Sequence, residues 1–100
     1  MTDRFRIYCV LSVGGDDSKS IAKNSKALAL DLASQYFDSF TVEKAEGRWH
    51  GEKEKTLVVT YLTELKTDVT LVNAFAHAYK YQNNQESVLI VEDQINARFY

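Results

Sequence analysis

The sequence has a single cysteine, two histidines and no long apolar run. One thiol cannot form a disulfide within the chain, so we expect a protein of a reducing cytoplasm, with Cys9 as a small buried core residue. Cys9, His50 and His77 fall short of the usual ligand sets for zinc, and we expect no metal site. No segment approaches the ~20 apolar residues of a membrane span, which predicts no membrane partner. Arg4 and Arg6 interrupt the start, where a secretory signal would need an apolar stretch.

The sequence also lacks an excess of positive charge. It has 12 basic and 14 acidic residues, a formal net charge of -2, and the two signs are interspersed. Proteins that bind nucleic-acid backbones carry clustered Lys and Arg, so we expect no nucleic-acid partner. Of the 100 residues, 45% are apolar and 26% charged, as is ordinary for a soluble globular protein. This length allows one hydrophobic core and therefore a single domain over residues 1–100.

The spacing of apolar residues predicts two helices and at least four strands. The expected elements are strands at 6–13, 40–46, 56–62 and 87–91, an optional edge strand at 95–100, and helices with apolar stripes over 21–36 and 69–79. Asp68 is expected to cap the second helix, and Asn83-Asn84 to end it. The order β-α-β-β-α-β predicts an α+β, ferredoxin-like fold, in which an antiparallel sheet carries both helices on one face.

Both faces of the predicted sheet carry apolar side chains. The residues that indicate this are Tyr8, Val10, Val58, Leu62 and Val88. The helices cover only one face, and the other is too apolar to be solvated. We therefore expect the second face to be buried against another subunit.

The segment 47–56, expected to be a long hairpin loop, contains the only tryptophan of the chain. A large aromatic there must contact either the core or a ligand. Glu54 stands next to a strand, where rigid backbone would hold its carboxylate in place. Two interpretations remain open. In one, Trp49 is tucked against the sheet beside a solvated charged tip. In the other, Trp49 and Glu54 form the walls of a small-molecule site that His50 could reach.

Three short patterns are similar to those of small bacteriophage S-adenosylmethionine lyases, and the order of elements agrees. They are Gly-x-aromatic followed by Glu-Lys-Thr within 47–56, Tyr-Cys-Val-Leu-Ser at 8–12, and Gln-Glu-Ser-Val-Leu-Ile at 85–90. The resemblance implies a homotrimer like the nitrogen-regulatory PII proteins, with substrate held between subunits. It also implies cleavage of S-adenosylmethionine to methylthioadenosine and homoserine lactone, without a cofactor. Phages use this activity in the host cytoplasm to deplete the cofactor of restriction-methylation.

The resemblance also implies roles for individual residues. The catalytic glutamate of the family matches Glu54, and its active-site glutamine matches Gln85 as a substrate-binding residue. The family tyrosine falls on Trp49, a departure that removes the phenol, and the hairpin is shorter here. Ser12 and His50 are further candidates for substrate contact. The alternatives are a non-catalytic PII-like oligomer that binds a nucleotide or a host protein, and a structural protein in which Trp49 is only core.

Overall fold

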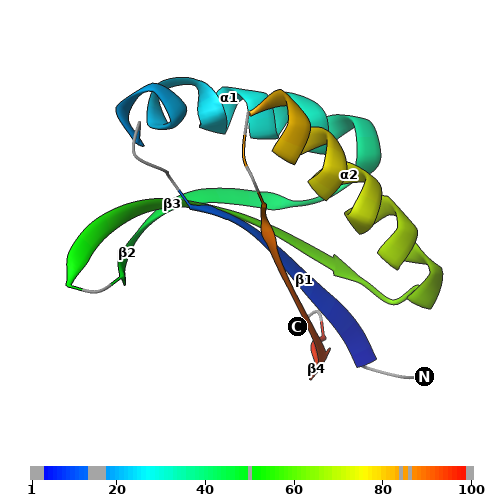
Figure 1. Ribbon diagram of the computed structural model, residues 1–100. Coiled ribbons are helices and arrows are strands. Elements are labelled where there is room, and N and C mark those ends of the chain that lie inside the picture. The colour runs from blue at the N-terminus through cyan, green and yellow to red at the C-terminus, as the bar shows by residue number, and fades with distance from the viewer. Residues whose placement is uncertain (1–3, 14–17, 50, 84, 86, 99–100) are drawn as a thin grey trace.

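The computed structural model contains one antiparallel sheet with both helices on the same face (Figure 1). It describes residues 4–13, 18–49, 51–83, 85 and 87–98. The elements are β1 (Arg4–Val13), α1 (Ser18–Tyr36), β2 (Thr41–Trp49), β3 (Glu52–Thr63), the 3-10 turn η1 (Lys66–Asp68), α2 (Val69–Gln82) and β4 (Leu89–Asn96).

The strands lie in the order β2-β3-β1-β4, and every neighbouring pair is antiparallel. Each helix therefore connects two parallel strands between which a third strand is inserted. α1 joins β1 to β2 with β3 between them, and α2 joins β3 to β4 with β1 between them. This is the split β-α-β topology of ferredoxin-like domains, and it confirms the predicted fold class.

The core lies between the sheet and the two helices. Its buried members are Tyr8, Val10, Ala29, Leu32, Ala33, Phe37, Leu57, Val59, Val72, Phe75, Ala76 and Tyr79. Phe37 joins the layers, because its ring stacks on Tyr61 of β3 at 4.2 Å between centroids and packs against Phe75 of α2 at 5.4 Å. Both predicted helical stripes are confirmed where side chains are described.

The opposite face of the sheet is covered by neither helix (Figure 1). We call it the uncovered face; its described apolar members are Phe5, Ile7, Cys9, Leu11, Ala45, Val58, Leu62, Leu89, Val91 and Ile95. Leu89 remains 60% exposed and Val91 44% exposed. Contiguous apolar surface of this kind is typical of a contact with another molecule.

Cys9 belongs to the uncovered face, so the expectation that it is a core residue is wrong. Successive side chains of a strand point to opposite faces, and Tyr8 and Val10 occupy the helix-covered side. Cys9 is half-buried, with its Sγ 3.8 Å from the hydroxyl of Thr60 on β3.

The expected long loop over 47–56 is also wrong. β2 continues to Trp49 and β3 begins at Glu52, with Gly47 opposite Glu54 in the ladder. Gly51, at the turn, has a φ of 81°, a left-handed conformation that glycine adopts without steric cost. A tight hairpin needs a connection of only about two residues. The charged residues on either side of the turn can therefore pair as strands.

β4 replaces the two short strands predicted at 87–91 and 95–100. The polar stretch between them continues the pairing with β1, since Glu92 lies opposite Tyr8 and Gln94 opposite Arg6. The break predicted between the two strands rested on the polar side chains there. An edge strand tolerates such side chains, so the strand continues through them. Within the described residues the sheet has four strands.

Asp68 sits at the start of α2 as predicted, but its carboxylate does not cap the helix. Its backbone is helical, with φ -68° and ψ -8°, and no side-chain capping bond forms. One carboxylate oxygen instead accepts hydrogen bonds from the Tyr61 hydroxyl at 2.8 Å and the Thr63 hydroxyl at 2.6 Å. Asp68 thus ties the end of β3 to the start of α2.

We expect Asp68→Ala to lower the free energy of unfolding by about 2–3 kcal/mol, because hydrogen bonds to a charged acceptor are lost and two hydroxyls lose their partner. Urea denaturation followed by circular dichroism measures this change. Glu64→Ala, at an exposed neighbouring position, is the control and should change stability by less than about 0.5 kcal/mol. Equal effects of the two variants would contradict the assigned role of Asp68.

Candidate functional site

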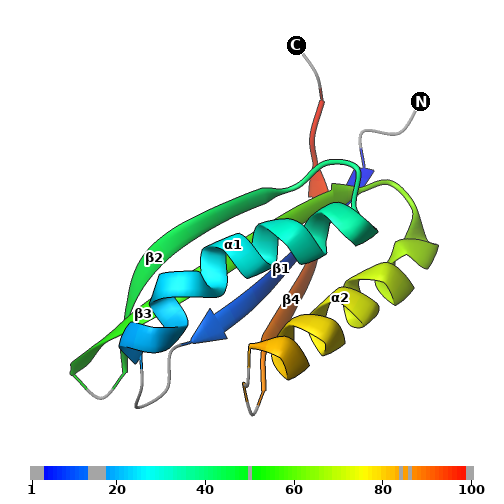
Figure 2. The ribbon, with the colours of Figure 1, turned by 90° about the horizontal axis from the view of Figure 1, so that it is seen from above.

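Most of the site residues predicted from the sequence have their backbone at one end of the sheet, where β1 finishes. Ser12 pairs with Leu57 in β3, and the β1 ladder ends at the next pair. Glu54 lies in β3 beyond that point, and Trp49 ends β2 opposite Glu52. Figure 2 shows the hairpin of β2 and β3 at this end, together with the start of α1 and the end of α2, and the chain termini at the other. His50 lies outside the described residues.

Gln85 lies at the same end, in the link between α2 and β4. Its backbone N–H donates to the carbonyl of Lys80 at 2.9 Å. The N–H of Asn83 donates to the carbonyl of Tyr79 at 2.9 Å, and the Asn83 amide donates to the Tyr79 hydroxyl at 3.1 Å. These bonds hold the link against the last turn of α2, so Gln85 has a defined backbone position.

A surface pocket of about 460 Å³ opens at this point, lined by His77, Lys80, Tyr81 and Gln85. We call it the α2-end pocket. Its volume is within the range of small-molecule sites. The described lining contains a cation, an imidazole, a phenol and an amide, and no carboxylate. These four described residues are therefore rich in hydrogen-bond donors and offer a cationic ligand no counter-ion.

Only one of these four residues was predicted from the sequence as a site residue. Gln85 came from the family resemblance, whereas His77, Lys80 and Tyr81 were not predicted as site residues. A signal was present, since 77, 80 and 81 are spaced i, i+3 and i+4 and must share one face of a helix. Their position just before the break at Asn83 puts that face at the helix end.

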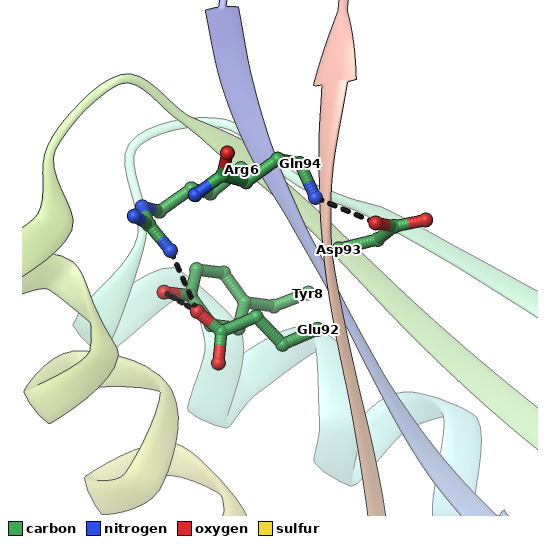
Figure 3. A network of polar contacts seen from close by, with 5 residues as sticks. All are labelled: Arg6, Tyr8, Glu92, Asp93 and Gln94. Atoms are coloured by element: carbon green, nitrogen blue, oxygen red, sulfur yellow. Dashed lines mark hydrogen bonds and ion pairs between the residues drawn. The ribbon is translucent and has the colours of Figure 1, made fainter.

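A second polar cluster joins β1 to the edge strand β4 (Figure 3). One carboxylate oxygen of Glu92 lies 3.0 Å from the Arg6 guanidinium and accepts a hydrogen bond from the Tyr8 hydroxyl at 3.1 Å. Tyr8 is 1% exposed. Burial raises the pKa of the Tyr8 phenol above its ordinary value, and the bond to Glu92 raises it further. The phenol is therefore a donor and not a base, and we assign this cluster to holding β4 on the sheet.

The pKa of the Tyr61 phenol is also raised above its ordinary value. Burial is again the largest cause of its raised pKa, followed by the hydrogen bond to Asp68. Both phenols keep their protons more tightly in the folded protein than in the unfolded chain.

The two tyrosines should make the folded state sensitive to alkaline pH. Their contribution to the free energy of unfolding is complete below the ordinary tyrosine pKa of about 10. It is lost as the pH rises through the higher pKa of the folded state, because the phenols of the unfolded chain ionise first. The free energy of unfolding should thus fall above about pH 10, and fall less steeply in the double variant Tyr8→Phe/Tyr61→Phe. Urea titrations at a series of alkaline pH values measure both slopes. Identical slopes would show that these phenols do not govern the effect.

Two further properties of the described residues bear on the chemistry. Among the described residues, no group of three or more His, Cys, Asp or Glu is placed to hold a metal ion. No helix in the described part of the chain is long and apolar enough to cross a membrane.

Comparison with known proteins gives matches in structure and none in sequence. No protein family and no curated protein matches the chain. A de novo designed protein with a ferredoxin fold matches with a TM-score of 0.54 and 9% identity, over 94% of this chain and 85% of that chain. A phage SAM lyase in the apo state matches with a TM-score of 0.52 and 15% identity, over 100% and 95%. A phage SAM lyase in complex with S-methyl-5'-thioadenosine has a TM-score of 0.49 and 16% identity, over 100% and 95%.

At these identities the likeness establishes the ferredoxin-like fold alone. One fold carries many activities, as the designed protein beside the lyase illustrates. The activity therefore has to be argued from the residues of the site.

Proposed function

We propose that this protein is an S-adenosylmethionine lyase that forms 5'-methylthioadenosine and L-homoserine lactone. The main supporting observation is topological. The β1 end with Ser12, the β2–β3 hairpin with Trp49 and Glu54, and the link with Gln85 are three separate parts of the sequence. Their backbone lies at one end of the sheet. The fold is one that a phage SAM lyase also has.

The reaction needs no strong base. The carboxylate of the substrate attacks the carbon next to the sulfonium, the carbon–sulfur bond breaks, and its electron pair leaves with sulfur as a neutral thioether. Two opposite charges vanish as the lactone closes, so a site of low dielectric destabilises the charged ground state and lowers the barrier. Holding the methionine tail in attack geometry adds a proximity effect with a ceiling of about 7–11 kcal/mol.

The residues of the site would then bind and orient the substrate. We assign Glu54 to the cationic part of the substrate, through its α-ammonium group or the adjoining ribose. The indole face of Trp49 would contact the sulfonium or the adenine, as aromatic faces do with cations. Gln85 would hydrogen-bond a polar edge, and Ser12 and His50 would provide further contacts. No cofactor takes part.

The proposed assembly is a homotrimer with substrate held between subunits. The uncovered face supports self-association, because it is apolar and a 100-residue domain gains stability by burying more surface. The distance across the sheet also supports a shared site. Glu54 is on β3 and Gln85 precedes β4, and the two strand spacings between them amount to about 10 Å. A neighbouring copy would close the gap.

If the protein is encoded by a phage, the proposed activity would deplete the methyl donor in the host cytoplasm and so counter restriction-modification. The second candidate function is binding without turnover, by a PII-like oligomer that takes up a nucleotide or a host protein. For that candidate, the concave and donor-rich α2-end pocket favours a small-molecule ligand over a host protein.

Glu54→Gln should abolish turnover of S-adenosylmethionine, by a factor of about 100 or more in kcat/KM, while leaving the circular dichroism spectrum unchanged. The neutral amide keeps the shape of the carboxylate and removes its attraction for the cationic substrate. Methylthioadenosine formation, followed by liquid chromatography, measures the effect. The matched control is Glu64→Gln, at an exposed position at the opposite end of β3, which should retain full turnover. Full activity in Glu54→Gln would show that the catalytic site is elsewhere.

Val91→Asp should convert the assembly into smaller species, because it places a charge on the β4 side of the uncovered face. Size-exclusion chromatography with light scattering measures the mass, which we expect to be that of a trimer for the wild type. Leu30→Asp is the control, since Leu30 on α1 is 41% exposed, close to the 44% of Val91, but lies on the helix layer. A monomeric wild type would contradict the proposed assembly.

A further inference from the structure

We propose that the α2-end pocket is an adenine-nucleoside subsite in which Tyr81 stacks on the purine and Gln85 recognises its amino edge. The pocket is lined by His77, Lys80, Tyr81 and Gln85. The choice of adenine rests on the proposed function, since S-adenosylmethionine and its product both carry this base. The assignment of Tyr81, Lys80 and His77 to the subsite comes from the pocket itself.

Tyr81 is the first reason for placing a planar ring here. Its side chain is 82% exposed, yet it lines a pocket and is the last aromatic of α2. A tyrosine this exposed gains little from folding, because most of its apolar area stays in water. A base stacked on such a face would bury both rings, and stacking of this kind accepts any purine.

Gln85 is the second reason, because an amide can distinguish one purine from another. A glutamine accepts a hydrogen bond from the adenine amino group and donates one to the neighbouring ring nitrogen N7. This requires the amide to be held in place, and the Gln85 backbone is tied to the Lys80 carbonyl at 2.9 Å. A 6-oxo purine would keep only one of the two bonds and would bind more weakly.

The charge of the lining indicates a nucleoside and not a nucleotide. Among the described lining residues the one ammonium group is that of Lys80, which lies in the last turn of a helix. That end of a helix carries partial negative charge, whereas phosphate sites use the opposite end. Lys80 and His77 are suited to donating hydrogen bonds to ribose oxygens at the rim of the pocket.

Isothermal titration of the purified full-length protein with 5'-methylthioadenosine tests the stacking role separately from turnover. We expect Tyr81→Ala to weaken binding by about tenfold or more, and Tyr81→Phe, which keeps the ring, to stay within about twofold of the wild type. Gln82→Ala is the matched control, an exposed neighbour on α2 that does not line the pocket, and should bind like the wild type. Equal affinities of Tyr81→Ala and Gln82→Ala, or no binding of methylthioadenosine to the wild type, would overturn the proposal.

The recognition of the amino edge has its own readout. The wild type should prefer adenosine over inosine by about tenfold, and Gln85→Leu should reduce that preference to about twofold or less. A preference that survives in Gln85→Leu would overturn this role of Gln85.

These titrations separate the subsite from the lyase activity. Tyr81-dependent binding of methylthioadenosine, with S-adenosylmethionine left intact, would uphold the subsite and contradict the proposed function. Cleavage of S-adenosylmethionine with the same KM in Tyr81→Ala and the wild type would uphold the lyase and overturn the subsite.

Discussion

The alternation of side chains along β1 determines how the other elements pack around this strand. β1 is a central strand, paired with β3 on one side and β4 on the other. Tyr8 and Val10 point to the helices, and Ile7, Cys9 and Leu11 point to the opposite face. Because the strand is apolar on both sides, one layer of helices cannot bury it completely. The domain therefore has a closed core and a second apolar surface that is still open.

This alternation also determines what lies at the ends of the sheet. α1 and α2 must both cross the face that carries Tyr8 and Val10, and their connections leave the sheet at its two ends. One end receives the β2–β3 hairpin and the link from α2 to β4, and with them the backbone of Glu54 and the α2-end pocket. The polar and charged residues that could bind or react with a ligand thus lie outside the core. Their number at one end is what makes that end the candidate site.

Much of the fold follows from apolar periodicity, and the failures have identifiable causes. The stripe ending in Phe75, Ala76 and Tyr79 predicted α2 correctly because burial requires that spacing. The hairpin was misjudged because charged residues were assumed to form a loop, although a ribbon with Gly51 at its turn can pair them. Cys9 was misassigned because composition alone does not say which side of an apolar strand is covered. The site was predictable only in part, since the pocket beside Gln85 is formed by the way the chain folds back on the end of α2.

The central claim is that the substrate's own carboxylate displaces the thioether within this protein. Incubation of the purified protein with S-adenosylmethionine in heavy-oxygen water, with early sampling by mass spectrometry, tests it most directly. We expect equal amounts of methylthioadenosine and homoserine lactone, and a lactone without heavy oxygen, because no water enters its ring. Unchanged S-adenosylmethionine would contradict the lyase, and homoserine labelled at its hydroxyl group would show that water is the nucleophile instead.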